Sequence, residues 1–159
     1  MAMGTSKTSD LQVVVFDVAG QQFGLEIASI SEIIRLDKIT PVPRAPAYVE
    51  GVIHIRGAVI PAVNIHALFN MPAGERGENN RVVIVETGTH KFGLIVDAVH
   101  EVKKMAPDMV KPAPPALSVD QQYLKGIILD GENLVIYIEP RKLLSEQDMQ
   151  VLQELEESS

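Results

Sequence analysis

The chain has 159 residues, carries a formal net charge of −7 and contains no cysteine. The lack of thiols excludes disulfides, thiolate catalysis and cysteine-ligated metals. The acidic balance argues against nucleic acid and against anionic membrane surfaces as partners, because both attract basic proteins.

Hydrophobic residues make up 46% of the chain and aromatic residues only 4%. Ile, Val and Leu must therefore fill the core, which favours β-structure. No apolar run has the length of a membrane span. Residues 1–10 are small and polar, without the apolar centre of a signal peptide, and we expect a disordered tail there. We expect a cytoplasmic protein.

Runs rich in Val and Ile alternate with turn residues along the whole chain. We expect strands over 11–18, 22–27, part of 29–36, 51–55 and 58–65, with a helical turn over 66–69. A second series follows over 81–87, 91–97, 102–105, 126–129 and 133–138. Five short strands per half predict a small closed barrel, because closure removes exposed sheet edges.

Near the C-terminus the spacing of hydrophobic residues changes from that of a strand to that of a helix. Ser145 can cap a helix, and Met149, Leu152 and Leu155 recur at three-residue steps. This pattern predicts a C-terminal helix and an acidic tail within 145–159.

The chain also contains an internal repeat. Val14-Val15-Phe16 and Phe23-Gly24-Leu25 recur as Val83-Ile84-Val85 and Phe92-Gly93-Leu94, 69 residues later (92 − 23). Further on, the pattern Tyr-x-x-Gly at Tyr48 recurs at Tyr123 with an offset of 75 (123 − 48), so the second copy is longer by 6 residues, which fall in the Pro-rich stretch 111–118. We expect a first barrel over 11–75 and a second over 76–144. Units this small bury too little surface to be stable alone, so they should share an apolar interface.

Candidate catalytic chemistry is almost absent. The histidines His54, His66, His90 and His100 show no metal-site spacing, and no nucleophile elbow or phosphate loop occurs. We expect no enzyme, no metal and no cofactor.

The most distinctive local feature is Arg56 in the Arg56-Gly57 turn between two apolar strands. We match Gly57 with Gly131 of the second copy, which places Asp130 where the first copy has Arg56. Arg56 is either a solvated hairpin residue or the ionic partner of Glu32, an acid that the second copy retains as Glu101.

These residues also carry a resemblance to a known family. The stretch from Val42 to Ile65 contains a Pro-x-x-Pro segment, then Gly51, then Arg56-Gly57 and the Ile60-Pro61 pair. Together with the Phe23–Ile33 segment and the Tyr123-x-x-Gly126 pattern, this stretch resembles the CheW-like chemotaxis coupling domain. The resemblance covers roughly residues 11 to 144. Asn64 departs from it, where the family commonly has Asp, and so does His54-Ile55, which is often Asn-Leu.

The resemblance implies an all-β fold of two five-stranded SH3-like barrels about a pseudo-twofold axis. It implies a non-catalytic adaptor between the cytoplasmic tips of methyl-accepting chemoreceptors and the regulatory domain of a CheA-type histidine kinase. The chain would then be recruited to receptor clusters at the inner membrane.

Three sets of site residues follow from the resemblance. The receptor-facing groove is expected at Ile30, Gly51, Arg56, Val83, Gly93 and Val102. The kinase-facing segment is expected at Leu36, Asp37, Lys38 and Ile39. A contact that closes a ring of kinase and adaptor domains is expected at Ala116 and Leu117.

Two alternatives stay open. The first is a CheW-like adaptor of another chemosensory circuit, serving surface motility or a second-messenger output. The second is a small-molecule-binding β-barrel, which the scarcity of interior polar residues disfavours.

Overall fold

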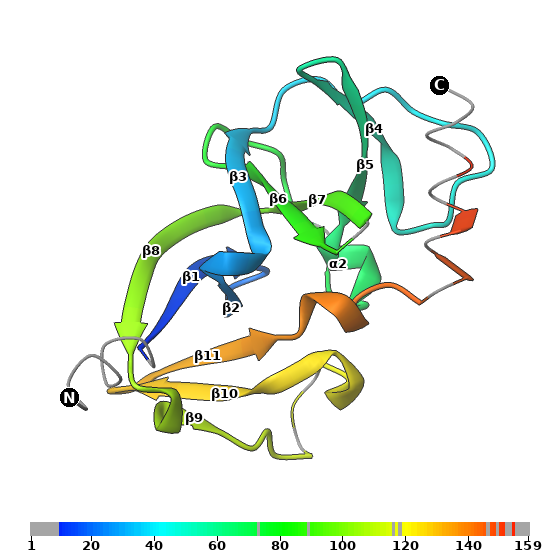
Figure 1. The fold of residues 1–159 in the computed structure, drawn as a ribbon. Coiled ribbons are helices and arrows are strands. Elements are labelled where there is room, and N and C mark those ends of the chain that lie inside the picture. The colour runs from blue at the N-terminus through cyan, green and yellow to red at the C-terminus, as the bar shows by residue number, and fades with distance from the viewer. Residues whose placement is uncertain are drawn as a thin grey trace.

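The protein forms two β-sheets with short helical turns between strands (Figure 1). The computed structural model describes residues 10–72, 74–88, 90–115, 117, 119–145, 147–148, 150–151 and 154. The first half holds β1 (Leu11–Val18), β2 (Gln21–Glu26), η1 (Ile27–Ser29), β3 (Ile30–Arg35), β4 (Val49–Ile55), β5 (Ala58–Asn64) and α2 (Ile65–Leu68). The second half holds β6 (Arg81–Thr87), β7 (His90–Val96), β8 (Ala98–Met105), η2 (Pro107–Met109), β9 (Val110–Lys111), η3 (Gln121–Tyr123), β10 (Leu124–Asp130), β11 (Asn133–Ile138) and η4 (Pro140–Lys142).

The strands are longer than expected where a polar residue interrupts the apolar pattern. The expected strand over 102–105 begins at Ala98, and that over 126–129 begins at Leu124. At the C-terminus, residues 147, 148, 150, 151 and 154 are helical, as expected, and Ser145 and Asp148 cap each other's backbone N–H groups at 3.0 and 3.1 Å. Met149, Leu152 and Leu155 lie outside the described residues, as do residues 1–9 of the expected tail.

The two sheets do not follow the two sequence repeats. One sheet has the order β8-β1-β2-β11-β10-β9, and the other has the order β3-β6-β7-β5-β4. The expected division into 11–75 and 76–144 therefore does not separate the sheets. Instead, the five-stranded sheet is one continuous stretch from β3 to β7, inserted between the two parts of the other sheet.

The sheets do not follow the repeats because each repeat contributes strands to the sheet of the other, in a reciprocal exchange. Val14 of β1 pairs with Val102 of β8, and Ile33 of β3 pairs with Val83 of β6. The repeat offset of 69 converts one pair into the other (83 − 14 and 102 − 33), so the same pairing is made twice, each time between copies. The parallel pairs Tyr137↔Gly24 and Ala62↔Gly93 repeat the exchange at β11–β2 and β5–β7.

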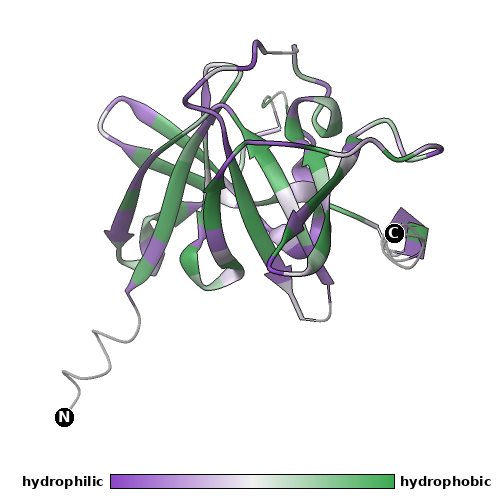
Figure 2. Ribbon diagram, turned by 90° about the horizontal axis from the view of Figure 1, so that it is seen from above, coloured by the Kyte–Doolittle hydropathy of each residue, from purple (hydrophilic) through white to green (hydrophobic). Residues whose placement is uncertain are grey.

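The hydrophobic core reflects this exchange. A central cluster takes buried residues from both repeats, including Phe16, Phe23, Val85 and Phe92. Two outer clusters each occupy one sheet, around Ile53 and Ile60 in one and around Ile128 and Val135 in the other. Ile128 and Val135 are the repeat counterparts of Ile53 and Ile60, each 75 residues later in the chain. Figure 2 shows the hydrophobic positions concentrated along the strands, with hydrophilic residues toward strand ends and loops.

Gly51 has a structural role that its repeat partner Gly126 shares. Thr40 forms an isolated bridge with Val52, with N–H···O distances of 2.8 and 2.9 Å. A Cβ at Gly51 would overlap the carbonyl oxygen of Thr40, and a Cβ at Gly126 would overlap that of Lys111 in β9. Both positions need glycine because a neighbouring backbone approaches so closely.

We predict that Gly51→Ala lowers the free energy of unfolding by about 2–3 kcal/mol, because a backbone carbonyl cannot move aside cheaply. Urea denaturation measures this loss. The control is Gly77→Ala, where an added Cβ meets nothing within 4 Å. Equal stability of the two variants would contradict the close approach of residue 40 to β4.

Candidate functional site

The strands β3 and β8 are the edges of their sheets and expose aliphatic side chains at equivalent positions. Ile33 of β3 is 38% exposed and Val102 of β8 is 53% exposed. Both strands start beside the central core, against which Ile30 and Val99 pack. In Figure 1 they run in opposite directions away from the middle of the molecule. Singly exposed aliphatic residues are common on protein surfaces, and what distinguishes these two is that they occupy equivalent positions on two sheet edges.

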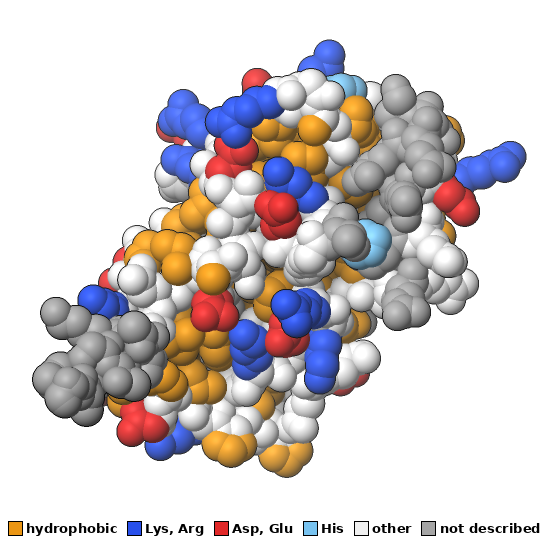
Figure 3. Space-filling model, in the orientation of Figure 1, with side chains coloured by type: hydrophobic (Ala, Val, Ile, Leu, Met, Phe, Trp, Pro, Cys, Tyr) orange, Lys and Arg blue, Asp and Glu red, His pale blue; other side chains and the backbone are white. Residues whose placement is uncertain are grey.

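The expected ion pair at the β4–β5 turn is present. Arg56 Nη1 lies 2.5 Å from Glu32 Oε2, which ties the turn to β3. The Arg56 side chain is nevertheless 77% exposed, so its guanidinium remains available to a partner. Figure 3 shows such mixed acidic and basic side chains over one face, with hydrophobic side chains reaching the surface between them.

Arg56 adopts a left-handed backbone conformation with φ of 49°. The strand register corrects our match of the turns: Ile55↔Ala58 is equivalent to Asp130↔Asn133, so Gly131, with φ of 64°, is the counterpart of Arg56 itself. Asp130 is therefore the counterpart of Ile55. A non-glycine residue in this region costs about 1–2 kcal/mol, and such strain is concentrated at functional positions.

Three of the residues expected in the receptor groove have no exposed side chain. Val83 is fully buried in the central core, and Gly93 is buried in β7 beneath Val82. Gly51 is buried against Thr40. In this structure they shape the surface from beneath, while Ile30 is half-buried and Arg56 and Val102 are exposed.

The expected kinase-facing segment divides into two kinds of residue. Leu36 and Ile39 are half-buried and pack against the outer core cluster around Ile53, so they already have partners within the chain. Packing within the chain therefore accounts for these two aliphatic side chains. Asp37 and Lys38 are exposed and border a surface hollow of about 600 Å³ that Ile34, His54 and Ile55 also line.

Of the expected ring contact, Leu117 is half-buried, and Ala116 lies outside the described residues. Ile33 was not among the expected site residues. The signal that could have found it is its equivalence with Val102 in the repeat.

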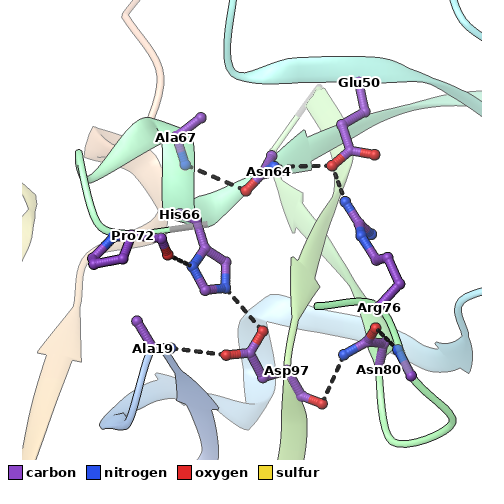
Figure 4. Close-up of polar contacts among 10 residues, drawn as sticks. Ala19, Glu50, Asn64, His66, Ala67, Pro72, Arg76, Asn80 and Asp97 are labelled. Carbon is purple, nitrogen blue, oxygen red and sulfur yellow. Dashed lines mark hydrogen bonds and ion pairs between the residues drawn. The ribbon is translucent and has the colours of Figure 1, made fainter. Parts of the chain in front are cut away.

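A polar cluster connects α2 with the end of β7 (Figure 4). His66 is only 8% exposed, and its Nδ1 lies 2.6 Å from the carbonyl oxygen of Pro72 while Nε2 lies 2.8 Å from Asp97 Oδ1. The other Asp97 oxygen accepts a hydrogen bond from the backbone N–H of Ala19 at 2.8 Å. The cluster thus joins the β1–β2 turn of one sheet to a helix that follows the other.

This histidine and carboxylate do not form a catalytic pair. Both ring nitrogens already contact oxygen atoms of the protein, so neither is free to contact a substrate. The adjacent hollow of about 40 Å³ has room for no more than a few water molecules. The neighbouring carboxylate of Glu50 is occupied by Asn64 at 2.9 Å and by an ion pair with Arg76. The cluster therefore holds segments together.

The shifted ionisable groups also have structural causes. Burial raises the pKa of Tyr48, and the Asp148 carboxylate raises it further. Burial opposes ionisation of Asp148, but the nearby Tyr48 hydroxyl and the hydrogen bonds with Ser145 outweigh it and lower its pKa. Burial, followed by Glu26 and Glu139, raises the pKa of Tyr137 to about 12. None of these groups titrates near neutral pH.

Within the described residues, no group of three or more His, Asp or Glu side chains could hold a metal ion. Nor does any helix among those residues combine the length and apolar character that crossing a membrane requires.

The fold and surface define a scaffold domain, and comparison with known proteins identifies its family. The CheW-like domain model matches residues 12–148, so the chain belongs to the CheW-like family. Proteins of this family are non-catalytic scaffolds. The expected fold of two SH3-like barrels is confirmed by the two sheets and by the structural neighbour described next.

The chain is 26% identical to the chemotaxis protein CheW of Klebsiella aerogenes, covering 96% of this chain and 92% of that protein. It superimposes on the crystal structure of the scaffolding protein TtCheW from Thermoanaerobacter tengcongensis with a TM-score of 0.81 and 32% identity, covering 87% and 90% of the two chains. It is also 22% identical to the protein FrzA of Myxococcus xanthus, covering 83% and 82%.

We predict that His66→Ala lowers the free energy of unfolding by about 2 kcal/mol, because it leaves buried acceptors unpaired. The exposed His54 provides the control, and His54→Ala should change stability by less than about 0.5 kcal/mol. Thermal or urea denaturation of both variants tests this. Unchanged stability of His66→Ala would show that the cluster does not hold α2 in place.

Proposed function

We propose that this protein is an adaptor that couples transmembrane chemoreceptors to a CheA-type histidine kinase in chemotaxis signalling. The observation that carries the proposal is the match of the CheW-like domain to residues 12–148, nearly the whole described chain. The protein would act at receptor clusters on the cytoplasmic face of the inner membrane.

The receptor-facing surface is formed by β3, β8 and the β4–β5 turn. Ile33 and Val102 supply exposed aliphatic anchors, and Arg56 supplies a charged rim. A receptor tip is a helical hairpin, and helices bind surfaces of this kind through regularly spaced apolar side chains with polar contacts around them. The strained backbone at Arg56 supports this role, because the equivalent glycine would relieve the strain.

The kinase-facing surface is the segment from Leu36 to Ile39 with the adjoining hollow. The exposed charges of Asp37 and Lys38 would contact the kinase regulatory domain, while Leu36 and Ile39 fix the segment to the outer core. The region of Leu117 would meet a neighbouring kinase domain and close a ring.

Coupling requires no chemistry in the adaptor. A change of receptor state alters kinase output only if the assembled adaptor binds the two states with different free energies. Two surfaces on a shared core suit this role, since the segment from Leu36 to Ile39 directly follows β3 and packs against the outer core of the same sheet.

The alternative is an adaptor of another chemosensory circuit, such as one that serves surface motility or a second-messenger output. The similarity to FrzA favours keeping this alternative.

We predict that Arg56→Glu weakens binding of a soluble receptor-tip hairpin by about tenfold or more while kinase binding changes little, because like charges then meet at the rim. Isothermal titration measures both affinities. The matched control is Arg44→Glu, since Arg44 is also exposed and left-handed, with φ of 64°.

Arg56→Gly separates function from folding. Glycine relieves the left-handed strain but removes the ion pair and increases unfolded-state freedom, so stability should stay within about 1 kcal/mol of the parent. Receptor affinity should still fall. Retention of full receptor affinity by both Arg56 variants, in folded protein, would limit this residue to a structural role.

We predict that Lys38→Glu weakens binding of the isolated kinase regulatory domain by about three- to tenfold without loss of stability. Ile39→Asp should lower both affinity and stability, because it introduces a charge against the outer core. Titration with kinase domain, alongside Lys142→Glu as an exposed control, measures these effects. Kinase affinity equal to that of the parent in both variants would remove this segment from the kinase interface.

A further inference from the structure

The described part of the chain crosses between the two sheets at two places, and the two crossings are built differently. β2 leads to β3 through Ile27–Ser29, and β7 leads to β8 through the single residue Asp97. The repeat offset of 69 makes Ala28 the counterpart of Asp97 (97 − 28). The alanine side chain has no polar atom with which to tie its crossing, and no residue of Ile27–Ser29 is buried. The two crossings therefore differ in how firmly their side chains can hold the sheets.

The hydrogen-bonding groups of Asp97 each contact a different segment (Figure 4). Its Oδ1 lies 2.8 Å from His66 Nε2 in α2, and its Oδ2 accepts a hydrogen bond of 2.8 Å from the N–H of Ala19 in the β1–β2 turn. Its backbone N–H donates to the carbonyl oxygen of Asp17 in β1 at 2.9 Å, and its carbonyl oxygen accepts a hydrogen bond of 3.0 Å from the Asn80 side chain. One residue at the crossing therefore contacts elements of both sheets.

The turn that Asp97 contacts is strained. Ala19 adopts a left-handed backbone conformation with φ of 50°, and its counterpart in the second repeat is Gly88, with φ of 71°. Glycine adopts this conformation without steric cost, whereas alanine does not. The repeat with the strained alanine is the one whose turn meets an aspartate, and the position equivalent to that aspartate is Ala28. Strain of this kind persists only where surrounding contacts enforce it, and the hydrogen bond to Asp97 is such a contact.

Hydrogen bonds also constrain the sheets in a way that the core does not. Apolar packing holds the sheets together but is non-directional, whereas a hydrogen bond requires a defined distance and angle. We propose that Asp97 is a clamp that fixes the angle between the two sheets, and that the unclamped crossing at Ile27–Ser29 is the hinge through which this angle changes when the clamp is removed. Short segments between elements absorb such changes in their backbone dihedrals. The clamp is a property of the free protein and goes beyond the proposed function.

The absence of cysteine allows a direct test, because two introduced thiols give two defined labelling sites. His54 of β4 and Glu132 in the β10–β11 turn are exposed and belong to different sheets. The full chain with His54→Cys and Glu132→Cys would carry a nitroxide label at each position. Double electron–electron resonance then measures the distribution of distances between the sheets.

We expect one narrow distribution in the labelled parent and a distribution about twofold broader in Asp97→Ala, because both side-chain contacts are lost. Asp97→Asn should keep the narrow distribution, since the amide offers an oxygen to the Ala19 N–H and an NH₂ group toward His66. Asp108→Ala is the matched control, because Asp108 is exposed in η2, and it should also leave the distribution narrow. The amide spectrum of each variant establishes that it is folded.

A second measurement uses the unmodified protein, in case Asp97→Ala does not fold. Ala19 and Gly88 occupy equivalent turn positions, but the Ala19 N–H is bonded to Asp97. Amide hydrogen exchange at Ala19 should therefore be at least about tenfold slower than at Gly88, after correction for intrinsic rates.

Three outcomes would overturn the proposal. A distribution in folded Asp97→Ala as narrow as that of the parent would show that the core alone sets the angle. Equal broadening in Asp97→Asn and Asp97→Ala would show that hydrogen bonding at this position does not set it. Equal corrected exchange rates of Ala19 and Gly88 in the parent would show that the turn is not clamped.

Discussion

The reciprocal exchange of strands between the repeats is the constraint on which the rest of the structure depends. Each repeat keeps its first hairpin in one sheet and gives its third strand to the other, as the pairs Val14↔Val102 and Ile33↔Val83 show. Neither repeat can then complete a sheet alone. The central core that contains Phe16, Phe23 and Phe92 forms only when both copies are present. The same exchange places β3 and β8 at the two edges that form the candidate receptor surface.

Much of the fold could be predicted from the sequence because its signals are local. The apolar runs, the glycine turns and the constant offsets of 69 and 75 predict the strands and the repeat. The partners of the strands could not be predicted in this way. Val102 has the same local sequence signal whether it pairs with Val14 or with Val83, since the repeat makes those two residues alike. Only tertiary packing distinguishes the pairings, and it favours the exchange between copies.

The candidate site was predictable where a residue departed from its repeat. Arg56 differs from its counterpart in the second copy, although only the strand register identifies that counterpart as Gly131, and its pairing with Glu32 follows from the retained acid. Val83 and Gly93 could not be distinguished from surface residues because their burial depends on the neighbouring sheet. The packing of Ile39 against the outer core could not be predicted for the same reason, since it depends on residues far away in the sequence.

A shared core implies that the proposed receptor and kinase surfaces belong to one cooperative unit. Native-state hydrogen exchange tests this claim most directly, by comparing the opening free energies of buried amides in the two sheets. The account predicts one common value for the most protected amides of β1, β2, β6 and β7, because opening either sheet removes strands from the other repeat. Two distinct values, one for each sheet, would contradict it.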